Sequence, residues 1–160
     1  FSIAGRKGRA DTGLIHARGG TGNLPAGEAF TAPVEGTARG RLVVPAGWYP
    51  GLKADMTLVF EQGYVTQVLG GGEVGAFYTN KFAFGDETKK HRRNCAELGI
   101  GTNPNAKKPD NVLEAEKILG TIHVAVGDSS HMGGVNESDL HEDFVLTSPV
   151  LVIDGQKVMG

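Results

Sequence analysis

The chain has 160 residues, which is enough for one domain with a hydrophobic core. Its 16 Lys and Arg residues nearly balance its 18 Asp and Glu residues, so the charge excludes the strongly basic surface of a nucleic-acid or anionic-membrane protein. The sequence shows no apolar run long enough for a membrane span and no signal-peptide pattern. The single cysteine, Cys95, excludes an internal disulfide and favours a reducing, cytoplasmic environment.

The first half of the chain reads as turns and short strands. Residues 1–27 are rich in glycine turn signals, and a β-branched run at 42–44 ends at Pro45. Residues 56–60 and 64–69 flank a Gly-containing turn and predict a β-hairpin.

The second half mixes helices and strands. We expect helices over residues 73–85, 86–98 and 111–119, with Asn111 and Glu114 forming a capping box in the last of these. Strands are expected over 121–126, 140–146 and 150–153. Since strands outnumber helices and do not alternate with them, the sequence predicts an α+β fold: a mostly antiparallel sheet with two or three short helices.

The strongest chemical signal is the pair His141 and Asp143. Residues two apart on a strand point to the same face, so an imidazole and a carboxylate would project together as half of a metal site. His123 lies in an otherwise apolar strand, where a buried imidazole needs a hydrogen bond or a metal. Taken alone, each pattern also fits an ordinary strand histidine.

Three acidic residues stand among small and apolar neighbours and are further candidates. Glu28 follows a Pro-Ala-Gly turn, Glu97 lies between Ala96 and Leu98, and Glu116 precedes His123. For an arbitrary glutamate the usual explanation is a solvated surface carboxylate. His131 lies in a glycine-flanked loop that could line a pocket.

Taken in chain order, segments that contain these residues resemble the metal motifs of the aminopeptidase T and aminopeptidase S family. Motifs that recur in the right order are more specific than any one alone. The segments are residues 23–35, 96–103, 116–127 and 138–145.

The resemblance implies that the chain, residues 1–160, is a single metal-binding catalytic domain. It would be the C-terminal part of a longer two-domain chain, in agreement with its start at Phe1 without an initiator methionine. It implies two divalent ions (zinc, cobalt or manganese), a peptide substrate and a homodimer. The metal ligands carried over by position are Glu28, Glu97, His123, His141 and Asp143.

In that scheme the paired metals activate a water molecule, which attacks the carbonyl of an N-terminal residue. Either Glu97 or Glu116 would be the general base, and the sequence does not choose between them. One departure stands out: Ser130 and His131 lie where such peptidases are expected to have a tyrosine.

Two alternatives stay open. A related ring-cleaving dihydroxypyridine dioxygenase uses one iron on two histidines and an aspartate, and His123, His141 and Asp143 fit that set equally well. The other alternative is a domain that is not catalytic in isolation. An exposed apolar face around Trp48 and Tyr49 would favour a missing partner domain, but a packed turn is the preferred interpretation of this Trp-Tyr-Pro run.

Overall fold

The computed structural model describes residues 1–108 and 110–160, and its elements form an α+β fold built mostly of antiparallel strands, as predicted. The strands are β1 (Arg9–Asp11), β2 (Glu28–Thr31), β3 (Gly40–Val44), β4 (Met56–Glu61), β5 (Tyr64–Gly70), β6 (Cys95–Gly101), β7 (Ile122–Gly127), β8 (His141–Leu146), β9 (Leu151–Ile153) and β10 (Gln156–Met159). The helices are α1 (Gly72–Lys81), α2 (Val112–Ala115) and the 3-10 helices η1 (Glu87–Arg93) and η2 (Ser130–Met132).

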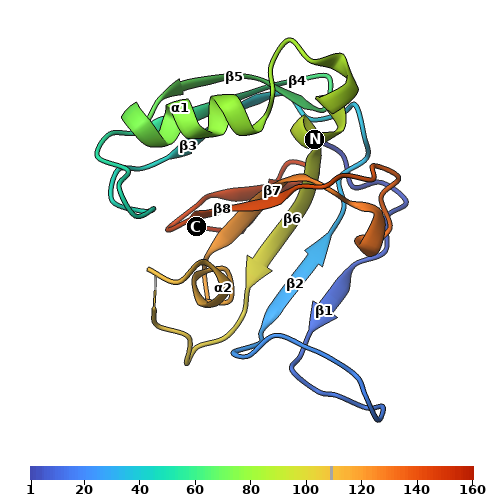
Figure 1. The fold of residues 1–160 in the computed structure, drawn as a ribbon. Coiled ribbons are helices and arrows are strands. Elements are labelled where there is room, and N and C mark those ends of the chain that lie inside the picture. Colours follow the sequence, from blue (N-terminus) through green and yellow to red (C-terminus); the bar gives the residue numbers. More distant parts are fainter. Residues whose placement is uncertain (109) are drawn as a thin grey trace.

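The largest sheet has five strands in the order β1-β2-β6-β7-β8, and all neighbours are antiparallel. A smaller sheet, β3-β4-β5, lies on one side of β7 and β8, with α1 beside it (Figure 1). Strands β9 and β10 form a separate hairpin. Segments from residues 9 to 146 are thereby brought side by side in one sheet.

The two faces of the large sheet differ because side chains alternate along a strand. Val124, Val126 and Phe144 point into the hydrophobic core shared with the small sheet. Burying each of these side chains stabilises the fold by about 1.5–3 kcal/mol. The opposite face therefore presents the alternate residues of the same strands, among them His123 and Asp143.

The hairpin expected over residues 56–69 is confirmed as β4 and β5. Its turn residues Gln62 and Gly63 both have positive φ. A side chain at Gly63 would overlap the backbone of Gly36, so the turn requires glycine there. The helix expected over 73–85 is confirmed in its first part as α1, which ends at Lys81. No helix of the described residues is long and apolar enough to cross a membrane.

The helix expected over residues 86–98 is wrong. Only Glu87–Arg93 is helical, as η1, and the chain then enters strand β6. Asp86 does cap η1, because its carboxylate accepts the N–H of Thr88. Pairing of β6 with both β2 and β7 outweighs the local preference for helix, which is a tertiary effect that a short window of sequence does not contain.

The helix expected over residues 111–119 is a single turn, α2. Asn111 makes no side-chain cap, and the carboxylate of Glu114 accepts backbone N–H groups of Lys107 and Lys108 instead. The capping box is therefore wrong. After α2 the chain passes Asn103, with which Ile118 forms a β-bridge.

Candidate metal centre

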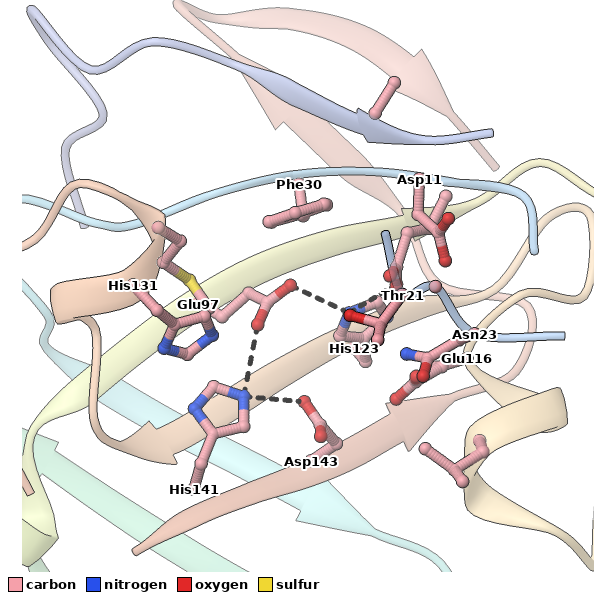
Figure 2. Close-up of a pocket in the computed structure, with 15 residues that line it drawn as sticks. Asp11, Thr21, Asn23, Phe30, Glu97, Glu116, His123, His131, His141 and Asp143 are labelled. Atoms are coloured by element: carbon pink, nitrogen blue, oxygen red, sulfur yellow. Dashed lines mark hydrogen bonds and ion pairs between the residues drawn. The ribbon is translucent and has the colours of Figure 1, made fainter. Parts of the chain in front are cut away.

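The predicted site residues line one cavity of about 540 Å³ on the face of the large sheet that is turned away from the core (Figure 2). A cavity of this size suits a small organic ligand. Glu28, Glu97, Glu116, His123, His131, His141 and Asp143 all contribute to its wall.

Strand register explains why these side chains meet. In the pairing of the central strands, His123 lies opposite Gly99, Asp143 opposite Ala125 and His141 opposite Gly127. A small residue thus lies across from each large ligand-type side chain. This pairing of small with large residues across neighbouring strands leaves room above the sheet for imidazoles and carboxylates to converge.

Glu97 lies between the two histidines. Its Oε1 is 3.3 Å from Nε2 of His123, and its Oε2 is 3.2 Å from Nε2 of His141. Burial raises the pKa of Glu97, but hydrogen bonds from the two imidazoles outweigh burial and lower the pKa to about 2. Glu97 is therefore a carboxylate at every physiological pH.

His141 is oriented by the backbone. Its Nδ1 lies 2.8 Å from the carbonyl oxygen of Asp128, so Nδ1–H donates there and Nε2 points toward Glu97 and Asp143. The Nε2 to Asp143 Oδ1 distance is 3.6 Å. Burial lowers the pKa of His141, but hydrogen bonds to Asp143 and Glu97 raise it to about 11. This imidazole faces more negative charge than one proton neutralises.

His123 is almost fully buried and has a different environment. Its Nε2 is 3.3 Å from Oε2 of Glu28 as well as 3.3 Å from Glu97. Its Nδ1 is also buried and has no hydrogen-bond partner among the described residues. Burial lowers the pKa of His123, but the neighbouring Glu97 and other carboxylates outweigh burial, so the pKa is raised overall.

Lys117 supplies a buried cation beneath the cavity. Its side chain is fully buried, its Nζ donates to Oε1 of Glu28 at 2.8 Å, and it also forms an ion pair with Oε1 of Glu116. The other carboxylate oxygen of Glu116 is buried without a partner among the described residues. Burial, together with the charge of Asp143, raises the pKa of Glu116 to about 7 against the effect of Lys117.

The ligand-type atoms fall into three overlapping groups, within each of which they lie within 4.8 Å of one another. None of these groups, within the described part of the chain, contains both histidines. Nitrogen and carboxylate donors in such sets fit zinc, manganese, cobalt or iron. The groups are Glu28, Glu97 and His123; Glu97, His141 and Asp143; and Glu116, His123 and Asp143.

The loop between β7 and β8 lies against the site. His131 lines the cavity, its ring packs edge-on against His141 with centroids 5.2 Å apart, and its Nδ1 lies 2.9 Å from Oδ1 of Asp128. Ser130 instead donates to the Asp128 carboxylate. Ser130, near the position where a tyrosine was expected, is therefore hydrogen-bonded within its own loop. His131 faces the cavity instead.

Two important residues were not predicted from the sequence. Lys117 directly follows Glu116 and precedes the apolar residues Ile118 and Leu119, and a lysine in that setting signals a buried ion pair. Asp128 acts through its backbone carbonyl on His141, which no side-chain pattern reveals.

The fold and this cavity together define a domain with a candidate metal centre built on an antiparallel sheet. Residues 2–160 match the profile of the family described as NicX: 2,5-dihydroxypyridine 5,6-dioxygenase, and the chain belongs to that family. None of the curated proteins compared with the chain matches it. The family match supports the dioxygenase that the sequence left as an alternative. The likeness to aminopeptidases, which the sequence suggested first, is found in the fold only.

Two solved structures share the fold. A 2,5-dihydroxypyridine dioxygenase from Pseudomonas putida KT2440 aligns with a TM-score of 0.71 and 23% identity, over 84% of this chain and 42% of that one. Wild-type AmpT from Thermus thermophilus aligns with a TM-score of 0.61 and 22% identity, over 90% of this chain and 39% of that one. The chain thus spans about two fifths of the length of either protein.

Proposed function

We propose that this domain holds the metal centre of an iron-dependent dioxygenase that opens a dihydroxylated pyridine ring or a closely related ring. The observation that carries the proposal is the group formed by Glu97, His141 and Asp143 at the cavity wall. Membership of the dioxygenase family supports it.

The three side chains suit a divalent ion in both charge and orientation. His141 is fixed by its bond to the Asp128 carbonyl, so its Nε2 lone pair can face the metal, as in metal sites generally. Asp143 and Glu97 add two negative charges, and one divalent cation balances them. An iron at this position would hold molecular oxygen beside the ring and relay electrons from the ring to oxygen, so that the ring is the reductant and both oxygen atoms enter the product.

The remaining cavity residues would bind and orient the substrate. Phe30 and Leu113 offer apolar surface for a flat ring, whereas Asp11 and Asn23 offer polar groups in the cavity wall. His131 donates from Nδ1 to Asp128, so its Nε2 can accept a proton from a ring hydroxyl. Loss of that proton makes the ring more electron-rich and easier to oxidise.

The test uses the full-length protein, reconstituted with ferrous iron without oxygen and then mixed with 2,5-dihydroxypyridine in aerated buffer. We expect one oxygen molecule to be consumed for each ring lost, measured with an oxygen electrode and by ultraviolet absorbance. Asp143→Asn should abolish both signals. Asp139→Asn is the matched control, because Asp139 pairs with Arg92 on the surface.

A second candidate is the metal-dependent aminopeptidase suggested by the sequence, with a peptide substrate and a homodimeric full-length protein. One observation favours it: the two oxygens of Glu97 face two different histidines, as a carboxylate shared by two metals would. Release of p-nitroaniline from aminoacyl p-nitroanilides by the zinc- or cobalt-loaded protein, without oxygen uptake, would select it. Metal binding without either turnover would leave a non-catalytic metal-binding domain.

A further inference from the structure

The loop that carries His131 has little regular structure of its own. Between β7 and β8 the regular element is the three-residue 3-10 helix η2, Ser130–Met132. Backbone bonds close the loop around the fully buried Ser129, whose N–H donates to the carbonyl of Asn136 at 2.9 Å and whose carbonyl accepts the N–H of Gly134 at 2.9 Å. The direction of His131 therefore depends on what holds this loop in place.

Glu35, in the segment that follows β2, reaches into the loop from outside it. Its Oε1 accepts the backbone N–H of Val135 at 2.7 Å and the hydroxyl of Ser129 at 3.4 Å. One oxygen atom thus contacts the chain on both sides of His131. A Cβ at Gly134 would lie 2.1 Å from the Ser129 hydroxyl and 2.9 Å from the same Glu35 oxygen, so the loop backbone fits closely around this carboxylate.

Arg6 holds the Glu35 carboxylate in this position. Its guanidinium forms an ion pair with Oε2 of Glu35 and donates to the carbonyl oxygens of Gly133, at 2.6 Å, and Pro33, at 3.4 Å. Both side chains are half-buried, so solvent screens this pair less than an exposed one. Burial raises the pKa of Glu35, but the Val135 hydrogen bond and the charge of Arg6 outweigh burial and lower it, so the carboxylate is ionised at neutral pH.

The same loop fixes the imidazole of His131, which faces the cavity (Figure 2). Nδ1 of His131 donates to the carboxylate of Asp128, 2.9 Å away, and this contact leaves Nε2 as the nitrogen that can accept a proton. Asp128 is adjacent in sequence to Ser129, which Glu35 contacts, so a shift of Ser129 also moves Asp128. A misplacement of about 1 Å at a reacting group can cost about 10²-fold in rate. His141 is carried by strand β8 instead, so metal binding depends less on the loop.

We infer that Glu35, held by Arg6, is a positioning residue for His131: it sets the tautomer and the direction of the imidazole that accepts the substrate's proton. Glu35 acts from a distance, since it is not among the described residues that line the cavity. The inference rests on the proposed function for the role of His131 in turnover, whereas the tautomer of His131 is measured without turnover.

The first experiment records nitrogen-15 NMR spectra of the full-length, zinc-loaded protein with labelled histidines, at about pH 8.5, roughly two units above the ordinary histidine pKa. Zinc is redox-inert, so no turnover interferes. In the wild type we expect His131 to be the Nδ1–H tautomer, and the spectrum of His131→Gln identifies its signals. Glu35→Gln should shift His131 toward the Nε2–H tautomer that a free imidazole prefers in water, because a glutamine amide cannot form the ion pair with Arg6.

The second experiment is a double-variant cycle on kcat, with the iron-loaded full-length protein and 2,5-dihydroxypyridine. Glu35→Gln should lower kcat by about tenfold or more, with iron per chain unchanged. Since Glu35 acts through His131, its loss should cost nothing further once His131 is replaced. The variant that combines Glu35→Gln with His131→Gln should therefore match His131→Gln within about twofold, whereas independent effects would multiply.

Glu87→Gln is the matched control, because Glu87 also forms an ion pair with an arginine, Arg93 at 3.2 Å, but on η1. It should keep the wild-type tautomer and kcat. Arg6→Lys keeps a cation beside Glu35 and should retain most of the activity, whereas Arg6→Met should behave like Glu35→Gln. If Glu35→Gln does not fold, as judged by circular dichroism, Arg6→Met carries the same two tests.

A wild-type tautomer and kcat in Glu35→Gln would overturn the inference and leave the proposed function standing. A multiplied loss in the double variant would also overturn it, because Glu35 would then support the fold in general. Loss of the Nδ1–H tautomer in Glu35→Gln, in a protein whose wild type consumes no oxygen, would refute the proposed function and leave the positioning of His131 by Glu35 standing. A wild type with His131 as the Nε2–H tautomer would overturn the inference whatever the turnover.

Discussion

Gly99 and His123 lie directly opposite each other on adjacent strands, and the imidazole fills the space that a side chain at Gly99 would need. The Nε2 and Cε1 atoms of His123 lie over the Cα of Gly99, so the ring lies across β6 toward Glu97 and Glu28. The direction in which His123 points is thus set by the absence of a side chain on the neighbouring strand.

Gly99→Ala should therefore displace the imidazole of His123. We expect the free energy of unfolding to fall by about 1–3 kcal/mol, the usual cost of overpacking a buried position, together with weaker metal binding. Urea denaturation and zinc titration measure the two effects. Gly8→Ala is the control, because the space around Gly8 is open and its φ is not positive. Equal stability of the two variants would show that the ring moves aside without cost.

The sequence predicted the fold class, the hairpin at 56–69 and the strands that hold His123, His141 and Asp143. Alternation of polar and apolar residues is a local property of the sequence, so it predicts these strands without knowledge of their partners. The strand that carries Glu97 was missed, because its identity depends on pairing with β2 and β7. Convergence of the candidate residues was expected only through family resemblance.

Other features of the site depend on distances between segments that are remote in sequence. The ion pair of Lys117 with Glu28 spans 89 positions. The carbonyl of Asp128 that orients His141 belongs to the backbone, which leaves no trace in residue type. The assignment of individual ligands and of the general base stays a prediction for the variants proposed above.

Glu116 should give the metal-free protein a distinctive pH dependence. Its pKa is raised from 4.5 to about 7, so between these values the folded state keeps a proton that the unfolded chain releases. The contribution of Glu116 to the free energy of unfolding is therefore greatest below about pH 4.5. It falls as the pH rises toward 7, by at most about 3 kcal/mol. Glu116→Gln should remove that decline, which urea denaturation at pH 5 and pH 7.5 in wild type and variant will measure.

Titrating groups that do not interact with Glu116 contribute equally to both proteins, so the difference between the proteins reports on Glu116 and on its coupled neighbours Lys117 and His123. Glu114→Gln is a suitable second comparison, because Glu114 is a half-buried glutamate outside the cavity. A hydrogen bond from the backbone N–H of Lys107 lowers the pKa of Glu114. It should leave the decline between pH 5 and pH 7.5 in place. A decline that persists unchanged in Glu116→Gln would contradict the raised pKa.

Metal binding should release a proton from His141. Burial lowers its pKa, but the hydrogen bonds from this imidazole to Asp143 and Glu97 raise it to about 11, so the metal-free ring is protonated at neutral pH. A metal needs the Nε2 lone pair, so binding should release about one proton, and affinity should increase about tenfold for each pH unit from 6 to 8. Calorimetric zinc titrations in two buffers with different ionisation enthalpies count the proton.

His141→Ala should bind no metal and release no proton. His16→Ala, which replaces an exposed histidine outside the cavity, should behave like the wild type. Binding to wild type with the same heat in both buffers would mean that His141 is not a ligand or does not hold a proton in the metal-free state.

His131 should affect turnover without affecting metal content. Its Nδ1 bonds to Asp128, its ring packs against His141, and it faces the cavity, so it can accept a proton from the substrate but lies outside the three metal-binding groups. His131→Gln should lower kcat by about 10²- to 10⁴-fold, the usual contribution of a general base, while iron per chain stays at the wild-type value. Oxygen uptake with 2,5-dihydroxypyridine and metal analysis on the same samples give both quantities.

The pH profile of His131→Gln separates proton transfer from packing. If His131 accepts a proton, the pH–rate profile of the variant should differ in shape from that of the wild type. If His131 only packs against His141, the variant should keep the wild-type profile at a lower rate and bind metal more weakly. A variant with an unchanged rate would remove His131 from the mechanism and leave the substrate proton to water or to Glu116, which lies in the cavity wall and whose pKa is raised to about 7.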